Sequence, residues 1–416
     1  MGGLGEEDAS SFMSDVSAQK RSALSKAKDA VKGLVKDATL GFAFPRSYAH
    51  AAKDPVDPRK VVFLESKQQE VPDSFRVLLD RLDADPRFEV YYISLGQHRI
   101  SRARYLANCA NALRQIATAR CVFLNDASDV VSCVALRPET RVVQLWHACG
   151  AFKKWGMSTA DLEFGGSREQ ILRHPFYGNL SLVTVSSPEV IWAYAEAMVL
   201  EDRRDIIRPL GVSRTDVFFD ESFLSCARAR VCEAVPQARS KKVMLYAPTF
   251  RGRVSKALGP DQLDIEAFCT AFNDEYVLLI KHHPFVKERP AIPAGCESFA
   301  FDISDAVSIE DALIVADVCI SDYSSLVFEY SLFERPMVFF AYDKEEYDDW
   351  RGFYYEYEDL TPGPVFCENE PMIEYLQHVE QRFDKTRVAQ FRQRFMSACD
   401  GHATDRIIKA VFDNGL

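Results

Sequence analysis

Short apolar runs alternate with amphipathic stretches from Arg59 onward. The runs KVVFLES, FEVYYIS, CVFLND and VVQLWH are rich in β-branched and aromatic residues, which favour strands. Between them lie segments such as VPDSFRVLLDRL, in which apolar residues recur at the spacing of one helix face. Parallel strands need a crossover, usually a helix, so this alternation predicts an α/β fold with a parallel sheet.

A second series of the same kind follows the first. LVTVSS, PEVIWAYAEAM and DIIRPLG complete the first series, and VMLYAPTF, YVLLIKHHP, ADVCISD and MVFF form the second. A chain of 416 residues is too long for one ordinary core, so we expect two doubly wound domains. We predict the domains at 59–208 and 209–385, between an N-terminal helical extension, 1–58, and C-terminal helices, 386–416.

The N-terminal extension contains a basic amphipathic segment. Residues 20–36 include six basic side chains and one acidic one, with apolar residues at helical spacing beside them. One interpretation is a helix packed on the body of the protein with its lysines in solvent. The other is an interfacial helix on anionic lipid. The apolar side is thin and contains Gly33, so this element alone should bind a membrane weakly.

Composition excludes several classes of protein. Hydrophobic residues make up 47% and charged residues 27%, as in soluble globular proteins, and no apolar run reaches the ~20 residues of a membrane span. The eleven cysteines show no metal-ligand spacing, so we interpret them as reduced thiols. The net charge of −11 argues against binding of nucleic acid. Walker, GxGxxG and HExxH motifs are absent from the sequence, so no metal or cofactor is expected.

Four polar clusters lie where a predicted strand gives way to a loop or a helix. The carboxyl ends of strands border the ligand crevice of an open α/β sheet. A histidine placed there can move a proton near neutral pH, although a single strand-end histidine is more often structural. Four such clusters together indicate one cleft shared by both domains. They are His147 with its basic loop, Thr249-Phe250-Arg251, His282-His283-Pro284 and the segment Ser321–Ser325.

The segment SDYSS has the clearest physical role. Asp322, Ser324 or Ser325 can cap the following helix, whose first amide groups lack partners within the helix. A helix start with two hydroxyls beside it binds phosphate readily. Glu329, one turn further on, is a candidate acceptor for ribose hydroxyls. The alternative is a plain capping motif, which is common.

The two other clusters of the second domain suggest further contacts to an anion. Thr249 and Arg251 fit such a contact, since a planar guanidinium suits phosphate oxygens; the alternative is a surface arginine. Pro284 favours an extended conformation for His283. Two adjacent histidines in extended chain point to opposite sides, so only one of His282 and His283 should enter the cleft.

These motifs resemble the CDP-glycerol glycerophosphotransferase family, which includes teichoic-acid primases and polymerases. The resemblance covers about 59–410 and rests on WHACGAFKKWG, RPLGVSRTDVFF, YAPTFRG, KHHPF, SDYSSLVFEYSLFERPMVFF and DGHATDRI, in this order. It implies a GT-B-like fold, with two Rossmann-like domains around the active site and C-terminal helices that cross back to the N-terminal domain. Many relatives have a WHGTPLK-type sequence where this chain has WHACGAFKK, a version also found in members that act on ribitol phosphate.

The resemblance implies transfer of a polyol phosphate, foremost glycerol phosphate, from a CDP-polyol to a polyanionic lipid-linked acceptor, with release of CMP. It also implies a peripheral protein on an anionic membrane surface, at the cytoplasmic face of the cell membrane. The essential histidines map onto His147 and His283. We expect His147 to act as general base on the acceptor hydroxyl, and His283 to help hold the pyrophosphate. The nucleotide-phosphate contacts map onto Thr249, Arg251, Ser324 and Ser325.

Several alternatives stay open. The basic side chains that follow His147 either guide the acceptor or form a solvated loop; they are Lys153, Lys154, Arg168 and Arg173. The enzyme can be a CDP-ribitol ribitolphosphotransferase of the same family. A GT-B glycosyltransferase or a nucleotide-sugar epimerase shares the fold and the serine-rich turn. A non-catalytic, membrane-associated binding module is the alternative from another class. The sequence leaves a homo-oligomer open.

Overall fold

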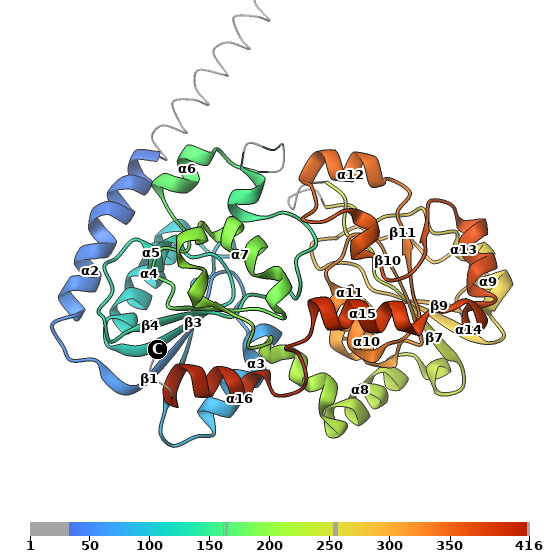
Figure 1. Cartoon of the computed structure of the whole chain (residues 1–416), viewed down its shortest axis with the longest axis horizontal. Helices are drawn as coiled ribbons and strands as arrows, with labels where there is room; N and C mark the ends of the chain where they lie inside the picture. The colour runs from blue at the N-terminus through green and yellow to red at the C-terminus, as the bar shows by residue number, and fades with distance from the viewer. Residues whose placement is uncertain (1–32, 161, 163–164, 253–256, 414–416) are drawn as a thin grey trace, which may run out of the picture.

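Two parallel sheets of six strands each form the centre of the protein, and helices cover their faces (Figure 1). The computed structural model describes residues 33–160, 162, 165–252 and 257–413. The predicted α/β fold with two doubly wound sheets is confirmed. Because both faces of each sheet are covered, the strands are apolar over most of their length and do not alternate. Val61 to Leu64, for example, are at most 2% exposed.

The first sheet has the strand order β2-β1-β3-β4-β5-β6. All its neighbouring strands are parallel. Its strands are β1 Asp57–Glu65, β2 Glu89–Ser94, β3 Ala119–Leu124, β4 Arg141–Gln144, β5 Leu182–Thr184 and β6 Ile207–Arg208. Its helices are α2 Phe44–Ala51, α3 Asp73–Asp83, α4 Arg102–Ile116, α5 Asp129–Ser132, α6 Arg168–Arg173 and α7 Ile191–Met198.

The second sheet has the order β12-β11-β10-β7-β8-β9, again with parallel neighbours only. The chain winds outward in both directions from β7 and β10, so the crevice predicted for such a sheet lies where these two strands end. Its strands are β7 Lys242–Tyr246, β8 Tyr276–Ile280, β9 Ala300–Asp302, β10 Val318–Ser321, β11 Met337–Phe340 and β12 Val365–Phe366. The helices from here on are α8 Glu221–Ala234, α9 Ile265–Phe272, α10 Ile309–Val315, α11 Leu326–Tyr330, α12 Lys344–Arg351, α13 Asn369–Leu376, α14 Val379–Arg382, α15 Lys385–Phe395 and α16 Ala403–Ile408.

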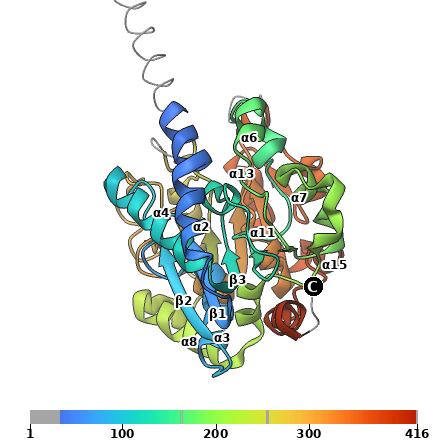
Figure 2. The ribbon, with the colours of Figure 1, turned by 90° about the vertical axis from the view of Figure 1, so that its left-hand side faces the viewer.

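The described part of the N-terminal extension is helical and packs on the first domain. Helix α2 lies along α4 (Figure 2) and buries Phe44 and Tyr48, and Leu40 is buried in the helical turn Thr39–Ala43 before it. The Tyr48 hydroxyl accepts a hydrogen bond from the backbone N–H of Arg137 at 3.1 Å. This part agrees with the interpretation of a helix packed on the body; residues 20–32 of the basic segment lie outside the described residues. Within the described part of the chain, every helix is too short or too polar to cross a bilayer.

The end of the chain returns to the first sheet. Helix α15 lies beside the second sheet, whereas α16 lies against the first (Figure 1). Ile407 and Val411 belong to the same apolar cluster as Val61 and Phe63. The Arg120 guanidinium donates to the carbonyl oxygen of Phe412. The last described helix therefore completes the core of the first domain.

Candidate active site

A strained turn at the end of β4 presents His147. Trp146 has a φ of 61°, a left-handed conformation that is unusual for a bulky residue. Its indole stacks on Trp155 with ring centroids 4.2 Å apart and lies 4.4 Å from the His147 ring. This stacking holds the turn and turns the His147 side chain away from the buried sheet, toward solvent.

Asn125, at the end of the neighbouring strand β3, determines the tautomer of His147. Nδ1 of His147 lies 2.9 Å from the Asn125 carbonyl oxygen. A carbonyl can only accept, so Nδ1 carries the hydrogen and Nε2 of the neutral ring has a free lone pair. The ring is open to solvent on one side, yet protein surrounds it on the others. This burial, with the charges of Arg214 and Lys67, lowers the pKa of His147, although Asp126 raises it.

The loop after His147 is attached to the second domain. Gly150 has a φ of +62°, and a Cβ atom there would lie 2.4 Å from the Phe328 ring, so no other residue fits. The Phe152 ring packs edge-on against Phe328. The backbone N–H of Lys154 donates to the Gly352 carbonyl oxygen at 3.0 Å. The loop that follows His147 therefore belongs to the interface between the two sheets.

His283 faces this loop from the carboxyl end of β8. Its Nδ1 accepts a hydrogen bond from the backbone N–H of Phe285 at 3.2 Å, so Nε2 carries the hydrogen in the neutral ring. The surrounding protein, and then the charge of Lys153 on the His147 loop, lower the pKa of His283 to about 4. His283 is exposed, whereas His282 is 4% exposed and its Nδ1 has no partner in the described structure. One of the two neighbouring rings is therefore exposed and the other buried, as the extended conformation favoured by Pro284 predicts.

The SDYSS turn places its serines at the start of α11 and its aspartate inside the protein. The Ser324 hydroxyl accepts from the backbone N–H of Leu326 at 3.4 Å, and Ser325 is the residue before the helix. Both serines are partly exposed. Asp322 is 2% exposed and accepts from the backbone N–H of Thr249 at 2.8 Å. Asp322 is therefore not a cap or a phosphate contact in this structure; it ties the end of β7 to the end of β10.

Arg251 has a different role from the predicted contact with phosphate. Its Nε and Nη2 donate to Asp343 at 2.5 and 2.9 Å, and its Nη1 donates to Asp322 at 2.9 Å. The rings of Tyr323 and Tyr347 lie 5.1 and 5.4 Å from the guanidinium carbon. Two carboxylates thus engage the guanidinium, because a buried charge needs partners of opposite sign. Arg251 thus ties together the segments that follow β7, β10 and β11.

Thr249 remains a candidate for the predicted contact with phosphate. It is 6% exposed, and its hydroxyl has no hydrogen-bond partner among the described residues. A buried hydroxyl without a partner is rare and suits a site that a ligand completes. The backbone N–H of Thr249 donates to Asp322, which precedes the serines, and the Thr249 carbonyl oxygen accepts from Arg251.

Glu329 lies too deep to contact a ribose in this structure. It is 3% exposed, and its carboxylate forms an ion pair with Arg214, in the segment that joins the two sheets. Burial raises the pKa of Glu329, and Arg214 opposes this shift. The prediction failed because one turn of helix fixes a spacing along α11 but not which neighbour the helix face meets.

The four basic residues predicted for the acceptor do not form one patch. The backbone of Lys153 pairs with Phe353 in a β-bridge, so Lys153 and Lys154 lie at the interface between the domains. Arg168 starts α6 and is exposed. Arg173, on the same helix, pairs with Asp37 at 2.7 Å. Of the four, only Lys153 and Lys154 lie in the loop that follows His147.

Sequence reasoning missed three residues that shape the site: Asn125, Arg214 and Asp343. Asn125 lies in CVFLND, Arg214 in RPLGVSRTD and Asp343 at the end of MVFFAYD, three segments that the sequence analysis had singled out. For two of them the sequence offers a signal, a polar residue shortly after a buried strand: Asn125 follows β3 directly and Asp343 comes three residues after β11. Among the described residues, no group of three His, Cys, Asp or Glu side chains is arranged to hold a metal.

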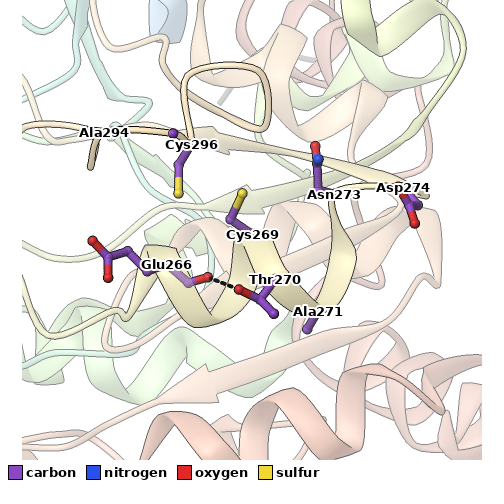
Figure 3. A pocket seen from close by; sticks show the side chains of 9 residues that line it. Glu266, Cys269, Thr270, Ala271, Asn273, Asp274, Ala294 and Cys296 are labelled. Carbon is purple, nitrogen blue, oxygen red and sulfur yellow. Dashed lines mark hydrogen bonds between the residues drawn. The ribbon is translucent and has the colours of Figure 1, made fainter.

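A cavity of about 560 Å³ lies away from these residues. It is lined by residues of α9 and the loop 294–296, with the thiols of Cys269 and Cys296 facing each other (Figure 3). None of the predicted site residues lines it. A smaller cavity of about 220 Å³, lined by Tyr246, Asp261 and His282, lies at the ends of β7 and β8. We therefore locate the candidate site from the positions of His147, His283 and the serine turn, and not from the size of a cavity.

Comparison with known proteins agrees with this arrangement. The family described as CDP-Glycerol:Poly(glycerophosphate) glycerophosphotransferase matches residues 47–413. A teichoic acid ribitol-phosphate primase of Bacillus spizizenii is 33% identical over 357 residues, which are 85% of this chain and 90% of the primase. A teichoic acid glycerol-phosphate transferase of Staphylococcus aureus is 29% identical over 289 residues, 66% of this chain and 72% of that protein. The structure of the wall teichoic acid polymerase TagF, variant H548A, has the same fold, with a TM-score of 0.74 at 20% identity over 93% of this chain and 97% of TagF.

Proposed function

Because the chain belongs to the CDP-glycerol:poly(glycerophosphate) glycerophosphotransferase family, we propose that it transfers a polyol phosphate from a CDP-polyol to a teichoic-acid-type acceptor. It is a transferase, as its family and relatives are. The observation that supports our assignment of the site is the pair of opposite tautomers across the interface. His147 offers a bare Nε2, and His283 offers an Nε2–H. One accepts a proton, and the other donates a hydrogen bond.

The proposed reaction is an in-line phosphoryl transfer. The acceptor hydroxyl attacks the polyol-bearing phosphorus while Nε2 of His147 takes the hydroxyl proton. A new P–O bond forms to the acceptor, the P–O bond to the CMP phosphate breaks, and CMP leaves with the electron pair. His283, Thr249 and the Ser324–Ser325 turn donate hydrogen bonds to the diphosphate, which neutralise its developing charge.

The polyol is the finer part of the proposal. The sequence favoured glycerol phosphate, with ribitol phosphate as the alternative. The relative named for ribitol phosphate is 33% identical over 85% of this chain, and the one named for glycerol phosphate is 29% identical over 66%. We therefore place CDP-ribitol ahead of CDP-glycerol as donor.

A panel of donors tests this proposal. The purified protein is incubated with CDP-ribitol, CDP-glycerol or UDP-GlcNAc and a lipid-linked acceptor, and release of CMP or UDP is measured together with the product mass. We expect CMP release and a mass increase of one or more ribitol phosphate units. UDP release would instead support the glycosyltransferase or epimerase alternative. Donor binding without turnover would support the binding-module alternative.

The acceptor implies a peripheral position at the cytoplasmic face of the membrane, and one surface fits that role. Four apolar side chains are 39–68% exposed on two helical segments that contact each other through the Asp37–Arg173 ion pair. An apolar patch of this kind buries itself in a lipid interface. The side chains are Leu34, Val35, Phe42 and Leu172.

Sedimentation with vesicles tests this surface. The wild type should sediment with vesicles that contain phosphatidylglycerol, and the L34E/L172E variant should stay in the supernatant. A variant with a charge on another exposed apolar position, F219E, serves as control because Phe219 is 41% exposed at the end of the segment Ser213–Phe219, which joins the two sheets. Equal sedimentation of wild type and L34E/L172E would exclude the patch as the membrane contact.

A further inference from the structure

The segment Ser213–Asp216, which joins the two sheets, sends neighbouring side chains in opposite directions. The Ser213 hydroxyl lies 2.8 Å from the hydroxyl of Thr404. The Asp216 carboxylate accepts from the backbone N–H groups of Ala403 and Thr404 at 3.0 and 2.8 Å. These contacts hold the start of α16. The side chain between them, Arg214, points toward the second domain.

Arg214 is a buried cation between two helices of the second domain. Its side chain is 16% exposed and pairs with Glu329 of α11, which is 4% exposed. Its Nη1 lies 3.7 Å from the Glu310 carboxylate of α10. Its Nε has no hydrogen-bond partner among the described residues. A guanidinium is removed from water at a large cost, so two carboxylates are needed to stabilise it here.

The same cluster touches the loop of the catalytic base. The thiol of Cys149, two residues after His147, contacts the Glu329 carboxylate. Cys149 also contacts Cys399, in the segment that crosses back to the first domain. Both thiols are 1% exposed. Arg214 therefore lies where the inter-sheet segment, the base-bearing loop and α11 come together.

Helix α11 is the element that follows the serine turn. Ser324 and Ser325 directly precede it, and Glu329 is on its buried side. A guanidinium that holds Glu329 thus fixes the position of the two serines relative to His147. A displacement of about 1 Å in such an arrangement lowers turnover by up to ~100-fold.

The charge of Arg214 also acts on the His147 ring. The charged groups around that ring are Asp126, Lys67 and Arg214. Lys67 and Asp126 form an ion pair at 2.7 Å, so their effects on the ring oppose each other. Burial raises the pKa of Glu310 to about 7, so this carboxylate only partly offsets Arg214 near neutral pH.

We propose that Arg214 is a positioning residue for the transfer reaction: through Glu329 it sets the serine turn against the His147 loop. The effect on turnover rests on the proposed function. The effect on the ring does not, since it requires no substrate.

The test follows the His147 ring directly by NMR. Protein labelled at histidine is titrated with pH, and the His147 signal is assigned by its loss in the H147N variant. In R214Q the midpoint should rise by about half a pH unit or more, because a nearby positive charge has been removed. In R214K the midpoint should stay near the wild-type value, but kcat should fall ~10–100-fold, since an ammonium group cannot bridge Glu310 and Glu329.

A matched control separates this role from the loss of any arginine–carboxylate pair. Arg230 forms a two-point ion pair with Asp311 at 2.6 and 2.7 Å between α8 and α10, beside Glu310 but without an effect on His147. R230Q should leave both the midpoint and kcat at wild-type values. An unchanged or lower midpoint in R214Q would overturn the proposal, as would wild-type turnover in R214K. If R214Q does not fold, the turnover of R214K decides whether Arg214 is a positioning residue. If no donor supports turnover in the wild type, the proposed function fails, while the titration of His147 still tests Arg214.

Discussion

The carbonyl oxygen of Asn125 lies 2.9 Å from Nδ1 of His147 and leaves the other ring nitrogen without a hydrogen. The two residues follow neighbouring parallel strands, β3 and β4, so the pairing of the sheet brings them together. The backbone of one strand end thereby prepares the side chain of the next as a proton acceptor. In the second domain His283 has the reverse arrangement, because a backbone N–H donates to its Nδ1.

Removal of the base should affect the rate and spare donor binding. General-base catalysis contributes ~10²–10⁴-fold, so His147→Ala should lower kcat by about that factor. Affinity for the CDP-polyol should be unchanged, because the contacts that we propose for it are on the second domain. Calorimetry on the variant measures the affinity, and CMP release measures the rate. A variant with wild-type turnover would show that another group takes the proton.

The activity should fall in acid at a pH below the usual range of histidine. Burial lowers the pKa of His147 from 6.5, so the ring accepts its proton only at lower pH. Since the protonated ring cannot act as base, kcat/KM should rise with pH through this lowered pKa and then stay constant. The measurement is a pH–rate profile in the free-enzyme regime. A midpoint above 6.5 would contradict the assignment.

Loss of His283 should weaken both binding and rate. In our proposal His283→Ala removes a hydrogen-bond donor to the diphosphate, and a buried ligand group left unpaired costs ~1–3 kcal/mol, or about 5–150-fold in KM. His283→Gln, which keeps a donor, should recover part of this loss. Donor titrations of both variants provide the comparison. Equal affinity in wild type and His283→Ala would remove His283 from the site.

Arg251 should prove structural. Asp343→Asn leaves one side of a largely buried ion pair without charge, which destabilises by roughly 3 kcal/mol. We therefore expect a lower midpoint of thermal unfolding for D343N in the absence of any ligand. Lys344→Gln, which disrupts the ion pair of an adjacent but more exposed residue with Glu358, should change the midpoint little. An unfolding midpoint of D343N equal to wild type would mean that Arg251 is available to a ligand after all.

Gly150 should tolerate no side chain. Its φ is +62°, and the Phe328 ring lies 2.4 Å from the position that a Cβ atom would take. Gly150→Ala should therefore destabilise by about 1–3 kcal/mol and misplace the His147 loop. Gly166→Ala is the control, because a Cβ there meets nothing within 4 Å. Chemical unfolding and kcat of both variants test this, and full activity in Gly150→Ala would show that the loop adapts.

The sequence revealed the elements and the edge at which the site lies, because burial and strand ends depend on local patterns. His147, His283 and the two serines were predicted in this way, and the structure places them after β4, β8 and β10. The partners of the buried charges were not found. Arg251 and Asp343 are 92 positions apart, and Arg214 meets Glu329 through the connection between two domains. Periodicity indicates which face of a helix is buried, but it does not indicate which distant group pairs with a charge on that face. For this reason the sequence predicts a ribose contact for Glu329, whereas in the structure Glu329 pairs with Arg214.

The return of α16 to the first sheet has a consequence for synthesis of the chain. The Phe412 ring lies 4.5 Å from Phe88 and 6.4 Å from Phe123, so the turn at Phe412 covers aromatic side chains of the first domain. A nascent chain that emerges N-terminus first therefore carries this apolar surface uncovered until the second domain has been translated. The first domain can therefore complete its core only after residue 412 has been made.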